Sequence, residues 1–142
     1  MNMKTSHAVL LATLLLTAAV IPPAQAAESA PLQIPATTPA IWQAIDQHVA
    51  ELAKLIQAGT LKEVHHHAFA IRDLSAALPA RAQQQSPEQR KQIDTQVKFV
   101  ATLAQRLDAS GDSNDRAGSE SNLTKLKGVL VNMRKLTAAP TV

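Results

Sequence analysis

Apolar residues recur at steps of three and four positions along most of the chain after residue 38, a spacing typical of amphipathic helices. The first helix is expected to begin at Thr38 as N-cap, with Pro39 at the first helical position, and to stop at Gly59. Its apolar stripe consists of Ile41, Ile45, His48, Val49, Leu52, Leu55 and Ile56. A histidine therefore lies at the edge of the face that this helix is expected to bury.

A second amphipathic stretch begins directly after Gly59. Thr60 and Glu63 have the spacing of a capping box, which predicts the start of a helix. Pro79 lacks a backbone N–H and restricts the residue before it, so this helix is expected to end or kink near Leu78. The stripe consists of Val64, Ala68, Ile71, Ser75 and Leu78. Because almost no loop separates the two helices, they are expected to form an antiparallel hairpin.

Two further helices are expected in the second half of the chain. Residues 80–85 are polar and predict a surface connection, with a helical extension beyond a kink as the alternative. Ser86–Gln89 predict a helix start by a capping box with proline at the first position. This third helix is expected to stop at Gly111. The start of the fourth stays open among four capable N-cap residues: Asp112, Ser113, Asp115 and Ser119. The apolar stripe of the third helix consists of Ile93, Val97, Val100, Ala104 and Leu107. The stripe of the fourth helix consists of Leu123, Leu126, Val129, Leu130, Met133 and Leu136.

No stretch alternates apolar and polar residues with the period of a strand, so the sequence predicts an all-α fold. Four amphipathic helices with at least one very short connection indicate an antiparallel up-down-up-down four-helix bundle over residues 39–137. A flexible arm over residues 27–38 is expected before it and a C-terminal tail over residues 138–142 after it.

Residues 1–26 have the pattern of a secretory signal peptide. Lys4 supplies a positive charge, residues 8–21 are apolar, and residues 24–26 (AQA) form a small-x-small cleavage site. The apolar run is shorter than the roughly 20 residues that span a bilayer, although an uncleaved anchor remains the alternative. We expect export to the periplasm or secretion, without stable membrane insertion of the mature chain.

Charge and composition argue against several classes of function. The formal net charge of +3 is too balanced to predict a nucleic-acid partner, and the only aromatic side chains are Trp42, Phe69 and Phe99. The chain has no cysteine, which excludes disulfides, thiol chemistry and covalently attached haem. No nucleophile motif, phosphate-binding glycine loop or carboxylate dyad is present, so an enzyme is not expected.

The histidines are the candidate metal ligands. Neighbours on a helix are separated by about 100°, so His65, His66 and His67 are expected to point in three directions. His67 lies at the edge of its apolar stripe, and the hairpin should bring it within about two helical turns of His48. A site made by these two residues and completed by Glu63 or water would suit Zn²⁺, Cu²⁺ or Ni²⁺.

Purely structural roles are the alternative for these histidines. A histidine at the edge of a helix stripe also serves as a partner for a carboxylate or a backbone carbonyl, and His66 is expected in solvent. The adjacent Arg72 and Asp73 are expected to form a surface ion pair.

The run from Val64 to Leu74 (VHHHAFAIRDL), with Ala77–Pro79 behind it, resembles the signature of small exported helical proteins associated with heavy-metal and copper efflux systems. Residues 97–100 (VKFV) and 107–112 (LDASGD) are similar to the same group, so the likeness covers most of the chain after residue 38. The resemblance implies a role in metal resistance and points to four residues: His65, Phe69, Arg72 and Asp73. The added His66 and His67 leave open which imidazole acts.

Three functions follow as expectations. The first is a periplasmic accessory protein of metal resistance or homeostasis, with His65, His67, His48 and Glu63 as metal ligands. The second is an adaptor or chaperone-like bundle that contacts an envelope protein without a metal. The third is non-covalent haem binding in a bundle like that of a b-type cytochrome, with Met133 as axial ligand, although a methionine in a leucine stripe is usually core. The oligomeric state stays open.

Overall fold

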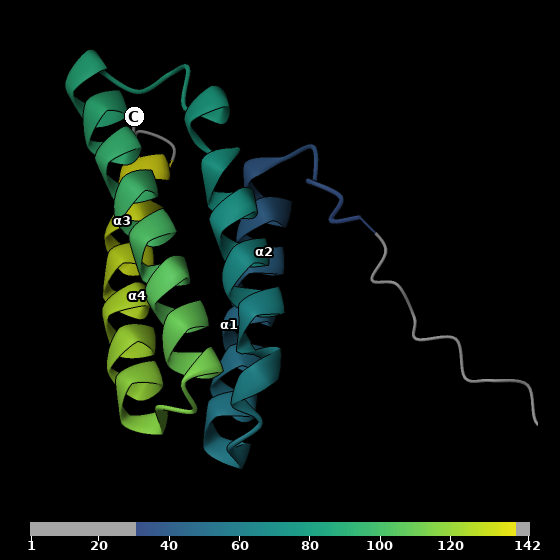
Figure 1. Ribbon diagram of the computed structural model, residues 1–142. Coiled ribbons are helices and arrows are strands. Elements are labelled where there is room, and N and C mark those ends of the chain that lie inside the picture. The colour runs from purple at the N-terminus through teal and green to yellow at the C-terminus, as the bar shows by residue number, and fades with distance from the viewer. Residues whose placement is uncertain (1–30, 139–142) are drawn as a thin grey trace, which may run out of the picture. The chain divides into compact units, whose positions relative to one another are not determined.

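The computed structural model describes residues 31–138, which form helices and no strand within that range. Figure 1 shows four long helices side by side: α1 (Thr38–Ala58), α2 (Val64–Ala76), α3 (Pro87–Asp112) and α4 (Arg116–Thr137). Two short 3₁₀ helices, η1 (Leu61–Glu63) and η2 (Pro79–Arg81), precede and follow α2. The all-α class is confirmed for this part of the chain. The predicted signal peptide, the start of the arm and most of the predicted tail lie outside the described residues.

The four helices share one apolar core. Each long helix packs against the next one in the sequence, and α1 also packs against α4. No residue of the four predicted stripes is exposed, and twelve large core side chains are almost fully buried: Ile41, Ile45, Leu52, Ile56, Val64, Ile71, Leu74, Leu78, Ile93, Leu107, Leu126 and Met133. Each such side chain stabilises the fold by roughly 1.5–3 kcal/mol. None of the helices within residues 31–138 is long and apolar enough to cross a bilayer.

Helix α1 begins one residue before the predicted position. Thr37, not Thr38, is the N-cap, and its hydroxyl accepts a hydrogen bond from the Ala40 amide at 3.4 Å. Pro39 therefore takes the second helical position, where it also needs no intrahelical N–H bond. The predicted stop is confirmed, because Gly59 closes the helix in the left-handed conformation with φ of 76°.

The predicted capping box at the start of α2 is wrong. The Thr60 and Glu63 side chains make no cap hydrogen bond, and η1 intervenes before α2 starts at Val64. This tight turn places Leu61 in the core at 3% exposure. Burying a leucine contributes more free energy than one cap hydrogen bond, which accounts for the departure.

The segment after α2 is not the simple surface connection that its polarity predicted. The Ala82 and Gln85 side chains are buried, and Gln85 Nε2 donates to the Ala138 carbonyl at 2.9 Å. Such a buried amide is stable only because it is hydrogen-bonded. The connection therefore helps to fasten the end of α4.

Helix α3 starts as predicted and ends later than predicted. Ser86 and Gln89 form a reciprocal capping box, with hydrogen bonds of 3.0 and 3.2 Å. Gly111 does not stop the helix, which continues through Asp112. It is instead a buried packing position, since a Cβ atom there would lie 2.6 Å from the Leu61 carbonyl oxygen.

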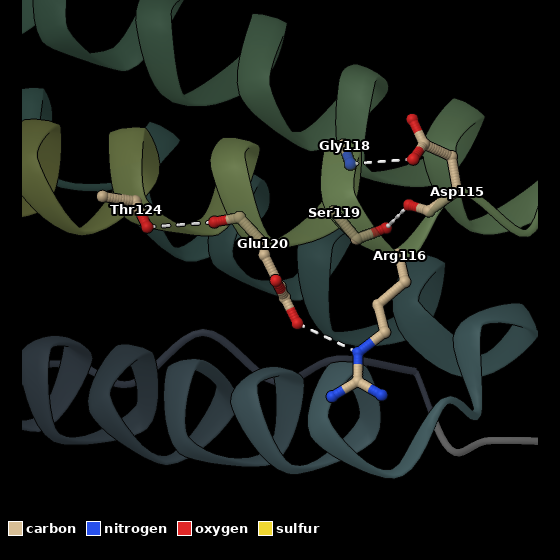
Figure 2. Close-up of polar contacts among 6 residues, drawn as sticks. All are labelled: Asp115, Arg116, Gly118, Ser119, Glu120 and Thr124. Carbon is tan, nitrogen blue, oxygen red and sulfur yellow. Dashed lines mark hydrogen bonds and ion pairs between the residues drawn. The ribbon is translucent and has the colours of Figure 1, made fainter.

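Asp115 starts α4 and decides among the four predicted caps. Figure 2 shows its carboxylate accepting a hydrogen bond from the Gly118 amide at 2.9 Å, while its carbonyl accepts one from the Ser119 hydroxyl at 2.9 Å. The Ser119 hydroxyl also lies 2.9 Å from that of Ser110. Both buried hydroxyls are thus hydrogen-bonded where α3 meets α4.

We predict opposite effects of alanine at two helical glycines. Gly111→Ala should lower the free energy of unfolding by about 1–3 kcal/mol, because the added methyl group overlaps a backbone carbonyl that cannot move freely. Gly128→Ala is the matched control: no atom would meet its Cβ within 4 Å, so the substitution should stabilise the protein by about 0.5–1 kcal/mol. Urea unfolding of both variants measures the difference, and equal effects would contradict the packing assigned to Gly111.

Candidate functional site

His48 of α1 and His67 of α2 contact each other across the interface between their helices. Their Nδ1 atoms are 2.9 Å apart, and their ring centroids are 5.2 Å apart with the planes inclined at 53°. Both residues are half-buried, as expected for residues at the edges of two facing stripes. The predicted convergence of these two side chains is therefore observed. In the neutral pair one Nδ1–H donates and the other Nδ1 accepts.

Burial keeps both imidazoles neutral. It lowers the pKa of His48 below the ordinary value, and the repulsion from a charge on His67 lowers it further. Burial also lowers the pKa of His67, with a further decrease from His66, while the carboxylates of Glu51 and Glu63 raise it in part. A neutral imidazole is the form that binds a metal ion, so the pair is held in the competent state at neutral pH.

Two carboxylates lie near the pair without completing it. Glu51, one turn after His48, receives a hydrogen bond from Lys54 at 2.7 Å, and this bond lowers its pKa. Glu63, which the sequence predicted as a ligand with His67, lies 3.6 Å from Nε2 of His66. Within the described part of the chain, no three His, Asp or Glu side chains are close enough together to hold a metal ion.

His65 and His66 form a separate surface pair. Their ring centroids are 3.8 Å apart, and His65 Nδ1 donates to the Lys62 carbonyl at 2.8 Å. That bond leaves Nε2 as the nitrogen of His65 with a free lone pair. His66 is exposed, as predicted. Of the four predicted ligands, the structure thus brings His48 and His67 into contact. Glu63 contacts His66 and acts on His67 through its charge, and His65 contacts the Lys62 carbonyl.

The remaining residues of the signature make local contacts. The Arg72 guanidinium lies 4.6 Å from the centroid of the Phe69 ring, and its Nε donates to Asp73 at 2.7 Å. The Arg72 and Asp73 side chains are partly exposed, so their contact agrees with the predicted surface ion pair.

Glu51 is not among the metal ligands predicted from the sequence. Its negative charge nevertheless raises the pKa of His67, and by more than the charge of Glu63 does. Its position three residues after His48 is the feature of the sequence that could have indicated its place near the histidine pair, because residues three apart on a helix share a face.

The chain matches no protein-family model, and no curated protein or solved structure shows detectable similarity to it. The resemblance of residues 64–74 to efflux-associated proteins stays a prediction.

We predict that the histidine pair makes stability depend on pH. The pKa values of His48 and His67 in the folded protein lie below the ordinary value. At a pH between the folded and unfolded pKa values, the unfolded chain therefore binds more protons than the folded protein. The free energy of unfolding should therefore fall as the pH is lowered from about 7.5 to about 5. Urea unfolding at both pH values measures it.

The double variant His48→Gln, His67→Gln should lose part of this dependence, and His66→Gln should keep it. Equal pH dependence in the parent and the double variant would show that the pair is not the titrating group.

Proposed function

We propose that this protein is an exported, non-enzymatic accessory protein that binds a divalent transition-metal ion between α1 and α2. The proposal includes an antiparallel up-down-up-down order of the four helices, which the short connections and the packing of α1 against both α2 and α4 support (Figure 1). The contact between His48 and His67 carries the metal proposal, because it joins two imidazole nitrogens from different helices.

The spacing of the two nitrogens is set by a hydrogen bond, so it bears on the choice of ion only through how far the rings must move when the proton between them is replaced. Metal–imidazole bonds are about 2.0–2.1 Å long, so two nitrogens at adjacent corners of a square-planar site lie about 2.9 Å apart, and at tetrahedral corners about 3.4 Å apart. The observed Nδ1–Nδ1 distance is 2.9 Å. Cu²⁺ and Ni²⁺ prefer the first geometry, while tetrahedral Zn²⁺ requires the rings to separate by about 0.5 Å. Cu²⁺ also has the highest intrinsic affinity of the three.

Water or a nearby carboxylate would complete the coordination. Glu51 is exposed and bound only to Lys54 among the described ion pairs, and a surface pair of this kind contributes little free energy. Its carboxylate can therefore leave Lys54 without a large cost. Glu63 would have to leave His66 in the same way. A site with two protein nitrogens and exchangeable remaining ligands suits reversible binding of a metal and its transfer to an envelope partner.

An interaction bundle without a metal is the second candidate. Phe99 on α3 and Val131 on α4 are 51% and 54% exposed, although both are large apolar residues. Exposed aromatic side chains such as Phe99 are enriched where one protein contacts another. A metal titration distinguishes the two functions.

We predict that mature protein titrated calorimetrically with Cu²⁺ at neutral pH binds one equivalent with a Kd of about 10 μM or lower, and Ni²⁺ and Zn²⁺ more weakly. His48→Ala and His67→Ala should each weaken binding by at least about 10-fold, since each removes a coordinate bond.

His66→Ala is the matched control, because it removes a neighbouring imidazole that does not contact the pair. His65→Ala tests the resemblance: a loss of binding in this variant alone would move the site to the position that the signature indicates. Unchanged binding in the His48 and His67 variants would leave the interaction bundle as the function.

A further inference from the structure

A cavity lies where the start of α1, the connection between α2 and α3, and the end of α4 come together. Its volume is about 480 Å³, and its walls include Trp42, Arg81, Gln84 and Arg134. The connection and the C-terminal end of α4 lie at the same end of the helices in Figure 1. This volume falls within the range of small-molecule sites, which is about 300–1,000 Å³.

Hydrogen bonds between the three segments hold the walls in place. Trp42 Nε1 donates to the Thr137 hydroxyl at 3.0 Å, which joins the start of α1 to the end of α4. Gln85 joins the connection to the Ala138 carbonyl at 2.9 Å. Arg81 donates to the carbonyls of Pro35 and Ala36 and so fixes the segment that leads into α1. The cavity is therefore formed before any ligand binds.

Within residues 31–138, the walls of the cavity carry two cations and no carboxylate. The Arg134 guanidinium is paired with Asp46 and lies 4.5 Å from the centroid of the Trp42 ring. Arg81, in contrast, takes part in none of the ion pairs within residues 31–138 and is bound only by neutral carbonyls. Its charge is therefore available to an anion.

The apolar part of the wall includes Pro39, which is exposed, and the small part of the Trp42 side chain that neither the core nor Arg134 covers. Trp42 is 5% exposed, and Pro39 lies one turn before it on the same wall. A flat apolar group packs well against such a surface, while the glutamine amides nearby can donate or accept hydrogen bonds.

We propose that this cavity binds a small organic anion with a flat apolar body, of the aromatic carboxylate class. The carboxylate pairs with Arg81, and the ring packs against Pro39 and the exposed part of Trp42. This site uses none of the histidines, so it does not depend on the proposed metal function.

Benzoate is a suitable probe, and Trp42 reports on its binding because it is the only tryptophan in the chain. The single indole N–H signal in a ¹H–¹⁵N spectrum of the mature protein should shift on titration, with a Kd of about 0.1–1 mM. Benzamide has the same shape without the charge and should bind at least about 10-fold more weakly, as should acetate, which lacks the ring.

Arg81→Gln should weaken benzoate binding by at least about 10-fold. Arg106→Gln is the matched control, because it makes the same change of charge at an exposed residue of α3 that does not line the cavity. Thermal unfolding of both variants checks that they are folded, and His67→Ala should bind benzoate as the parent does. Equal affinity for benzoate and benzamide, equal effects of the two arginine variants, or no shift of the indole signal would each overturn the proposal.

Discussion

The reversal of the chain at Gly59 determines where the two histidines of the candidate metal site lie. The left-handed conformation of this residue ends α1, and the amides of Gly59 and Thr60 cap the last carbonyls of that helix. Leu61 then enters the core at once, so that α2 packs back along α1. His48 lies eleven residues before the turn and His67 eight after it, and helices that fold back so tightly bring such positions to similar heights. Their contact is therefore a consequence of the hairpin.

The pattern of the sequence was sufficient to predict features that depend on local periodicity or on a single helix cap. The buried stripes, the capping box of Ser86 and Gln89, and the stop at Gly59 are of this kind. The approach of His48 to His67 also followed, because both lie at edges of stripes in a predicted hairpin. In each case residues three or four apart, or directly at a turn, carry the information.

The departures arise where tertiary packing outweighs a local signal. Thr60 and Glu63 have the pattern of a capping box, but the burial of Leu61 selects a 3₁₀ turn. Gly111 has the character of a helix stop, yet its lack of a side chain allows the Leu61 carbonyl to approach. The cavity could not be predicted from the sequence for a related reason. Its walls come from three distant segments, and no pattern of helical spacing connects Trp42, Arg81 and Arg134.

The two candidate sites differ in the sign of the charge that surrounds them. At the histidine pair, burial disfavours protonation while Glu51 and Glu63 make the surroundings attractive to a cation. A metal ion can satisfy both conditions, since it binds neutral nitrogens and still brings positive charge close to the carboxylates. At the other site, the partners of Arg81 within residues 31–138 are neutral carbonyls, which leaves a charge that favours an anion. Both rest on α1, through His48 and Trp42, and the apolar core that holds this helix needs neither ligand for its stability.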